Sequence, residues 1–340
     1  MLRLLCLLSF SLLLGCADKS KDESKLVSLT GKALGTTWTV KIRNIEPVDK
    51  DELRADVAAK IEETEKIFSH WRPDSKLYQL NESLTTDPLS IPPLLHELLK
   101  HAKWTHEQTA GAFDPTIAPL VNLWGFGPVS ENRTRIPTED EINRILEQVG
   151  MKQLEILPNK RVRKKIPTIQ IDLSGSAKGE IIDLVCEFLN QRDLSNYLVE
   201  IGGEIRTSGY GKDGQGWIVA LEDGSEGKRN GLSTVTLRSY SVATSGIYRQ
   251  SKPNPDSGKP ATHLIDPRTG RPVEHDLVAV NVLAPTARNA DALATALMIL
   301  GPKTGMKLAE RLDLAVRFCL EEANGSRIIL SPAYQRLFAE

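Results

Sequence analysis

Two oxygen-bearing side chains stand one helical turn apart in an apolar, alanine-rich stretch near the C-terminal end. The stretch covers residues 289–300, NADALATALMIL, and carries Asp291 and Thr295. Residues four apart project from the same face of a helix, and a carboxylate and a hydroxyl are hard ligands that suit Mg²⁺. In the alternative, structural interpretation Asp291 caps the helix and Thr295 bonds back to a carbonyl. The spacing alone favours neither interpretation.

A loop of glycine and serine forms the second candidate. Residues 171–180, IDLSGSAKGE, follow a predicted strand and lead into a predicted helix. Lys178, at the helix start, could bind an anion with help from the helix dipole, and Asp172 could accept hydrogen bonds from a base or a ribose. The loop is neither a Walker A motif nor a dinucleotide-binding G-x-G-x-x-G pattern. A plain strand–helix turn therefore stays open as the alternative.

Two more loops place small residues at the ends of predicted strands. They are Gly202-Gly203 and Thr244-Ser245-Gly246, and both permit a phosphate or a sugar to approach the backbone closely. Each could be an ordinary turn. Together with the two stretches above they make four candidate segments at element ends, which indicates a site of nucleotide size.

One histidine and three aromatic residues complete the candidates. His263 lies beside a short predicted strand, where it could take a proton from a hydroxyl nucleophile near neutral pH; a structural role is the alternative. Trp71, Phe113 and Trp124 lie in polar or glycine-containing loops. They could stack on a flat ring or form a satellite hydrophobic cluster.

The elements that must position these residues are a mixture of helices and strands. Apolar spacing predicts helices over 51–68 and 93–108, and a capping box of Thr138 and Glu141 starts a helix that ends at Gly150. Alternation predicts strands over 36–43 and 168–173, and a C-terminal hairpin that turns at Asn324-Gly325. We therefore predict an α+β fold of mixed, mostly antiparallel sheets with packed helices.

The composition is that of an ordinary globular protein. The chain has 340 residues, 40% of them hydrophobic, and a net charge of −1. It is long enough for one large domain or two lobes. A charge so close to zero argues against general nucleic-acid binding, which needs a basic face.

The first sixteen residues, MLRLLCLLSFSLLLGC, differ from the rest. A basic residue, a short apolar run and a small residue before Cys16 predict a lipoprotein signal over residues 1–15, with lipidation at Cys16; an ordinary secretory signal is the alternative. Polar residues within 16–29 predict a lipidated tether, followed by a domain over 30–340. Export with membrane anchoring follows, and a second apolar run long enough to span a bilayer is absent from the sequence.

Two cysteines, Cys186 and Cys319, belong to the predicted domain. An oxidising compartment would permit a disulfide between them, but two buried free thiols are favoured. Their spacing relative to the histidines does not indicate a zinc site.

Taken in order, the motifs resemble the ApbE family of FAD:protein FMN transferases. The matching stretches lie within residues 33–302, in the order LGTTWTV, FSHWRPDSKLYQLN, GAFDPTIAPLVNLWGFG, IDLSGSAKGEIID, VEIGGEI, VATSGIYR, HLIDPRTGRPV and NADALATALMILG. The resemblance implies the ApbE-like fold with an FAD cleft. It also implies transfer of FMN from FAD to a threonine hydroxyl in a Ser/Thr-Gly-Ala-Thr type motif of an acceptor protein, with release of AMP.

The resemblance assigns roles to particular residues. Asp291 and Thr295 match side-chain metal ligands for Mg²⁺, Gly175 matches a ligand through its backbone carbonyl, and His263 matches the base. The FAD-contacting positions are Leu34, Trp71, Ala112, Phe113, Asp114, Asp172, Lys178 and Ile265. Three residues depart from the usual family pattern: Leu34 replaces Met, Glu204 replaces Asp, and Gly175 replaces Ala or Thr. None of these departures removes a required functional group.

The resemblance also implies partners and a location. The acceptors would be flavin-bearing subunits of the sodium-pumping NADH:quinone reductase or of Rnf-type complexes, and the enzyme would be anchored on the periplasmic side of a bacterial inner membrane. Ala17 directly after Cys16 leaves outer-membrane sorting open. Two other activities also stay open, namely hydrolysis of FAD to FMN and AMP, and FAD binding without turnover.

Overall fold

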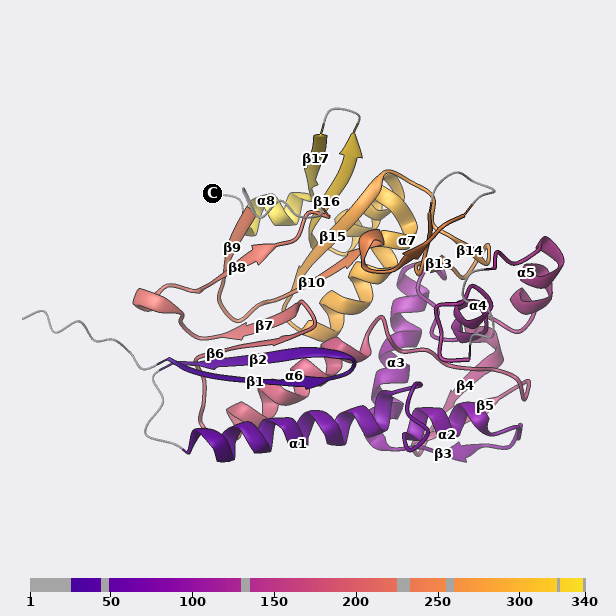
Figure 1. The fold of residues 1–340 in the computed structure, drawn as a ribbon, viewed down its shortest axis with the longest axis horizontal. Coiled ribbons are helices and arrows are strands. Elements are labelled where there is room, and N and C mark those ends of the chain that lie inside the picture. The colour runs from indigo at the N-terminus through magenta and orange to yellow at the C-terminus, as the bar shows by residue number, and fades with distance from the viewer. Residues whose placement is uncertain are drawn as a thin grey trace, which may run out of the picture.

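An antiparallel sheet of eight strands organises the protein (Figure 1). The computed structural model describes residues 26–43, 49–129, 135–224, 233–254, 260–322 and 325–338. Every neighbouring pair in the sheet is antiparallel. In spatial order the strands are β1 (Val27–Ala33), β2 (Thr36–Ile42), β6 (Tyr197–Ile201), β7 (Glu204–Ser208), β10 (Ser241–Gly246), β15 (Leu277–Ala284), β16 (Ala315–Glu322) and β17 (Gly325–Leu330).

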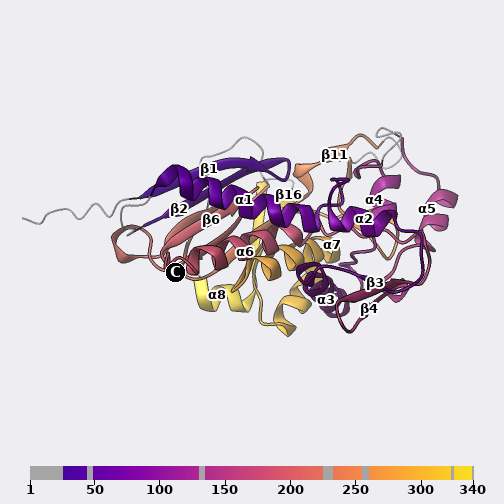
Figure 2. The same ribbon diagram turned by 90° about the horizontal axis from the view of Figure 1, so that it is seen from below.

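Helices cover one face of this sheet. The chain forms α1 (Lys50–Phe68), α2 (Lys76–Glu82), α3 (Pro93–Gln108), α4 (Ala118–Leu123), α5 (Glu139–Leu146), α6 (Ala177–Asn190), α7 (Ala287–Arg311) and α8 (Pro332–Phe338). Apolar residues of α1 and α6 pack against β2 and β6, and those of α7 pack against β10, β15 and β16. Figure 2 shows α1 and α6 side by side, with α7 further along toward the end of the molecule that carries α3 and α4.

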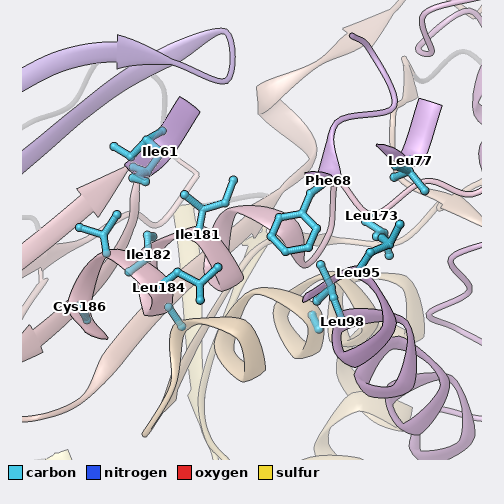
Figure 3. Packing of buried hydrophobic residues seen from close by; sticks show 14 of the residues in the cluster. Ile61, Phe68, Leu77, Leu95, Leu98, Leu173, Ile181, Ile182, Leu184 and Cys186 are labelled. Atoms are coloured by element: carbon cyan, nitrogen blue, oxygen red, sulfur yellow. The ribbon is translucent and has the colours of Figure 1, made fainter. Parts of the chain in front are cut away.

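The core beneath α1, α3 and α6 is built from large aliphatic and aromatic side chains. Phe68 of α1, Leu95 and Leu98 of α3, and Ile181 of α6 gather there (Figure 3), and each is at most 2% exposed. The apolar residues of α1 recur at helical spacing because one face of the helix is buried. This layer fixes the first turn of α6 relative to the sheet.

The opposite face of the sheet is covered by a hairpin and by α8. Strands β8 (Trp217–Leu221) and β9 (Ser233–Leu237) pack with α8 on residues such as Val242 and Leu283, whereas the neighbouring Ala243 and Val282 face α7. Successive strand residues point to opposite faces. Strand β15 is buried on both faces, so its sequence LVAVNVLA is almost continuously apolar rather than alternating.

The remaining strands are short and form small separate sheets. They are β3 (Leu89–Ser90), β4 (Leu154–Leu157), β5 (Arg161–Lys164), β11 (Ser251–Lys252), β12 (Ala261–Thr262), β13 (Ile265–Asp266) and β14 (Arg271–Pro272). Strands β3, β5 and β4 form a small sheet near α3, α4 and α5, at the opposite end of the molecule from β8 and β9 (Figure 1).

The α+β prediction is confirmed, and so are most of the elements. The helices over 51–68 and 93–108, the capping box of Thr138 and Glu141, and the C-terminal hairpin are present. The third helix ends at Leu146 rather than Gly150, because Gln148 and Val149 make only tight turns to the carbonyls three residues back. Asn324, the first residue of the predicted hairpin turn, lies outside the described residues.

The prediction of a strand over 168–173 is wrong. Ile169, Ile171 and Leu173 are buried in alternation, as in a strand. However, the backbone of Ile171 exchanges two hydrogen bonds with the side chain of Asn81, and the N–H of Asp172 donates to the carbonyl of Pro115. The segment is extended, but a side chain and a loop take the place of a neighbouring strand.

The N-terminal boundary also shifts. The predicted signal over 1–15, Cys16 and most of the tether lie outside the described residues. Strand β1 begins at Val27 and Leu29 is fully buried, so the folded part starts before residue 30 and within the range predicted as tether. Within the described ranges, no helix combines the length and apolar character that crossing a bilayer requires.

Candidate active site

A cavity of about 930 Å³ brings together every residue that the family resemblance assigns to metal binding, to catalysis or to FAD contact. Its wall includes Leu34, Trp71, Ala112, Phe113, Asp114, Asp172, Gly175, Lys178, His263, Ile265, Asp291 and Thr295. These residues span more than two hundred and fifty positions of sequence, and the fold places them around one space. A cavity of this volume matches the range of small-molecule and cofactor sites.

Two hairpin tips form one wall. Leu34 and Gly35 connect β1 to β2 with φ of 53° and 70°, and Gly202 and Gly203 connect β6 to β7 with φ of 60° and 99°. Two left-handed residues in a two-residue loop are typical of the type I′ hairpin turn. Because β2 pairs with β6, the tips lie side by side, and a Cβ on Gly202 would lie 3.0 Å from the methyl carbon of Thr36. The sequence predicts a strand that ends at the paired glycines. In the structure these glycines form a tight turn that joins this strand, β6, to its antiparallel neighbour β7.

The start of α6 and one face of α7 form another wall. Asp291 is 4% exposed, and its Oδ2 accepts a hydrogen bond from the N–H of Gly179 at 2.9 Å. The structural interpretation of Asp291 as a helix cap is wrong, because α7 begins one turn earlier and Thr286 caps it. Thr295 lies one turn further along the same face, with its Oγ1 3.4 Å from the Oγ of Ser245.

The oxygens in this wall suit a hard divalent cation. A Cβ added to Gly175 would lie 3.0 Å from the Oγ1 of Thr295, so the backbone of this turn closely approaches α7. Burial raises the pKa of the Asp291 carboxyl to about 7, although the positive charge of Lys178 and the hydrogen bond from the N–H of Gly179 act in the opposite direction. A bound cation would favour the ionised carboxylate. A carboxylate, a hydroxyl and a backbone carbonyl are the ligand types of Mg²⁺, so the residues present fit that ion.

The orientation of His263 is fixed by the backbone. Its Nδ1 lies 3.0 Å from the carbonyl oxygen of Gln250. A carbonyl can only accept, so Nδ1 carries the proton and Nε2 is the free basic nitrogen of the neutral ring. Burial lowers the pKa of His263, and the positive charges of Arg249 and Lys178 lower it further. The histidine is therefore an unprotonated base near neutral pH.

Comparison with known proteins identifies the architecture. The model of the ApbE family matches residues 34–318. A Vibrio cholerae protein named FAD:protein FMN transferase is 35% identical over 333 residues, which cover 98% of this chain and 97% of the relative. An Escherichia coli protein of the same name is 31% identical over 94% of this chain and 93% of the relative. The chain belongs to the ApbE family.

Solved structures agree with this result. The flavin transferase ApbE from Vibrio cholerae superposes with a TM-score of 0.84 at 34% identity, over 92% of this chain and 99% of that one. The flavinyl transferase ApbE of Pseudomonas stutzeri, in its apo form, gives 0.85 at 34% identity, over 93% and 98%. The resemblance and the ApbE-like fold predicted from the sequence are confirmed.

The ApbE cavity also contains charged residues that the sequence analysis did not single out. Arg249 donates from Nη1 to the carbonyl of Gly202 at 2.9 Å and lies 3.5 Å from Glu222, and all three line the cavity. Lys178 forms an ion pair with Glu204 at 2.7 Å. The sequence marks the segment before Arg249 only by its small residues, because no spacing rule identifies an arginine that follows a turn.

Two acidic residues of the ApbE cavity are already engaged within the protein. Asp114 accepts at Oδ1 from the N–H and the hydroxyl of Thr116, and at Oδ2 from the N–H of Met151. Asp172 accepts at Oδ1 from the N–H of Ser174, 2.7 Å away. Asp114 therefore shapes the loop around Phe113, and its carboxylate has little capacity left for a ligand.

The aromatic residues divide into two groups. Trp71 is 49% exposed at the cavity and Phe113 lines it, so both can contact a flat ring. Trp124 is 2% exposed in a separate cluster, and its indole N–H donates to the carbonyl of Gly270 at 2.7 Å. For Trp124 the satellite-cluster interpretation is confirmed.

Proposed function

We propose that this ApbE-family enzyme transfers FMN from FAD to a threonine hydroxyl of an acceptor flavoprotein, releases AMP, and requires Mg²⁺. Relatives along almost the whole chain bear the name FAD:protein FMN transferase. The observation that carries the proposal is the placement of a neutral histidine with a free Nε2 in the same cavity as a buried carboxylate and hydroxyl. Group transfer to a weakly nucleophilic hydroxyl needs both a base and charge neutralisation.

The chain's own residues account for the proton and for the orientation of the substrate. The threonine Oγ attacks the phosphorus of the FMN half, the bond from that phosphorus to the bridging oxygen breaks, and AMP leaves with that oxygen. The Nε2 of His263 takes the threonine proton. Trp71 and Phe113 offer apolar surface to the isoalloxazine ring, and Lys178 and Arg249 supply positive charge to the phosphates.

Asp291, Thr295 and the carbonyl of Gly175 would hold the Mg²⁺ ion. When bound, the ion neutralises the crowded charge of the diphosphate and makes the phosphorus more electrophilic. Within the described residues there is no cluster of three or more His, Cys, Asp or Glu side chains that could hold a metal. The proposed ligand set does not need such a cluster, because two of its three oxygens come from a hydroxyl and a backbone carbonyl.

The partners and the location follow from the family and from the N-terminal sequence. The proposed acceptors are flavin-bearing subunits of the sodium-pumping NADH:quinone reductase or of Rnf-type complexes. Lipidation of Cys16 would hold the enzyme on the periplasmic side of the bacterial inner membrane. The support is the basic residue, apolar run and small residue that precede Cys16.

The test is incubation of the mature chain with FAD, Mg²⁺ and an acceptor that carries a Ser-Gly-Ala-Thr motif. Flavin fluorescence that stays on the denatured acceptor supports transfer. Free FMN and AMP without acceptor labelling indicate hydrolysis, and unchanged FAD indicates binding alone; either result contradicts the proposal.

Two variants assign the roles. We expect His263→Ala to bind FAD but to label no acceptor, because no other group takes the proton. We expect Asp291→Asn, which keeps the size of the side chain, to lose the dependence of transfer on Mg²⁺ concentration along with most of the rate. Full labelling by His263→Ala would refute its assignment as the base.

A further inference from the structure

Helices α6 and α7 meet in an antiparallel series of three contacts. The turn residue Gly175 lies against Thr295, and Gly179 donates its N–H to Asp291. Four residues further along α6, Asp183 contacts the first turn of α7. Each step of four residues advances about 6 Å along a helix, and the steps run in opposite directions on the two helices. Two of the three contacts contain the proposed cation ligands, and the third contains Asp183.

The contact at Asp183 is a helix cap supplied by another helix. Oδ1 of Asp183 accepts from the N–H of Ala287 at 2.9 Å, and Oδ2 accepts from the N–H of Arg288 at 3.0 Å. These N–H groups belong to the first turn of α7, where no intrahelical partner exists. A carboxylate there also meets the positive end of the helix dipole. Asp183 is 7% exposed, so little water competes for these bonds.

Asp183 is itself held from the sheet. Nη1 of Arg206 on β7 lies 2.5 Å from its Oδ1. At the next contact the helices touch through their backbones, since a Cβ on Gly179 would lie 2.3 Å from the carbonyl oxygen of Ala287. These contacts thus oppose both a shift of the first turn of α7 along the helix axis and its rotation about that axis. Residues 287, 291 and 295 share one face, so this constraint extends to Asp291 and Thr295.

We propose that Asp183 is a positioning residue that sets the spacing of the cation-binding oxygens. This inference rests on the proposed function. A shift or rotation of α7 at its first turn moves Asp291 and Thr295 relative to Gly175, which is fixed to α6. Mg²⁺ requires near-ideal octahedral geometry and tolerates such a shift poorly.

The test compares two caps of the same helix. Asp183→Asn keeps the side-chain size but removes the charge and replaces one acceptor with a donor. The control, Thr286→Ala, removes the local cap, in which the Thr286 hydroxyl accepts from the N–H of Asn289. Both variants should lower the melting temperature by a few degrees. Of these two caps only Asp183 joins α7 to α6, so of the two variants only Asp183→Asn should change cation binding.

The readout is the dissociation constant of Mn²⁺, measured by electron paramagnetic resonance with ADP present as a diphosphate that carries no flavin. We expect Asp183→Asn to weaken Mn²⁺ binding by roughly tenfold or more, the usual effect of removing an outer-shell partner. The same variant should raise the Mg²⁺ concentration needed for half-maximal transfer by a similar factor. Saturating Mg²⁺ should then largely restore its transfer rate. Thr286→Ala should bind Mn²⁺ like the wild type.

The outcomes separate this inference from the proposed function. Normal Mn²⁺ binding by Asp183→Asn, or an equal loss in both variants, overturns the inference alone. A wild-type chain that binds no Mn²⁺ overturns the proposed cation site and the inference with it. If Asp183→Asn does not fold, Asp183→Glu replaces it, because a carboxylate one methylene longer can still accept from the first turn of α7 but changes the spacing between α6 and α7. Weaker binding then supports the inference, and unchanged binding overturns it.

Discussion

The protonation of His263 depends on one backbone carbonyl and on burial. The carbonyl of Gln250 fixes the proton on Nδ1, and burial lowers the pKa from its ordinary value of 6.5. The basic form is therefore present above that lowered pKa and is lost as the pH falls through it. We expect kcat/KM for transfer to rise with pH along a titration centred below 6.5 and to be level by about pH 7. A rate that still rises tenfold per pH unit above about pH 7 would contradict this assignment.

Leu34 lines the cavity with a strained backbone conformation. Its φ of 53° lies in the left-handed region, which disfavours leucine and suits asparagine. We expect Leu34→Asn to raise the free energy of unfolding by about 1 kcal/mol and to weaken FAD binding, because an apolar contact in the cavity is lost. Denaturant unfolding and fluorescence titration with FAD measure the two effects.

The neighbouring glycine provides the matched control for this residue. A Cβ at Gly35 meets nothing within 4 Å, but the φ is 70°. Gly35→Ala should therefore lower the free energy of unfolding by about 1 kcal/mol through backbone strain alone. Stabilisation by Gly35→Ala, or a loss of stability in Leu34→Asn, would show that strain at this tip is not the dominant effect.

At the scale of an element, α7 depends on a histidine from outside the helix. Pro302 has no N–H to donate to the carbonyl of Met298, and Gly301 has a non-helical φ of 71°. The Nε2 of His275 lies 2.7 Å from that carbonyl oxygen and supplies the missing donor. The Met298 carbonyl at the kink in α7 thus keeps a hydrogen-bond partner.

This contact predicts a stability effect that is separate from chemistry. We expect His275→Ala to lower the free energy of unfolding by about 1–3 kcal/mol, because the Met298 carbonyl loses its partner. Mn²⁺ affinity should change little, because Asp291 and Thr295 lie on the N-terminal side of the kink. Urea unfolding measures the first effect. An unchanged midpoint would mean that water replaces the histidine.

At the scale of the whole molecule, the two cysteines of the domain lie in separate parts of the core. Cys186 packs in the layer of α1, α3 and α6, Cys319 lies in β16, and both are free and fully buried. This confirms the favoured prediction of two free thiols over a disulfide. Burial raises the pKa of Cys186 to about 12 and that of Cys319 to about 11.

Thiol labelling therefore reports global unfolding. We expect neither Cys186 nor Cys319 to react with Ellman's reagent in the native state of a chain that lacks residues 1–15 and carries Cys16→Ser, because both are thiols in the core. Both should react in denaturant, at the same midpoint as the loss of the circular dichroism signal. Fast labelling of one thiol before that midpoint would show that one layer of the core opens independently.

Local signals determined much of this protein from its sequence. Helical spacing, the capping box of Thr138 and Glu141, and turn residues such as Gly202-Gly203 act within a few residues, so their physics can be read without a fold. The spacing of Asp291 and Thr295 likewise placed two oxygens on one helical face. The local pattern gave a wrong strand prediction at 168–173, because this buried extended segment forms its hydrogen bonds with Asn81 and Pro115, which are distant in the sequence.

Only the tertiary structure decided which of those residues share a cavity, how deeply each is buried and which tautomer His263 adopts. Asp291 could have been a cap; the start of α7 at Ala287 and its cap at Thr286 excluded that role. Asp183 and Arg249 gave no signal in the sequence because their partners lie tens of residues away. Burial, the tautomer of His263 and the approach of α6 to α7 arise from contacts between segments that are distant in the sequence. The spacing of side chains along one segment therefore cannot predict them.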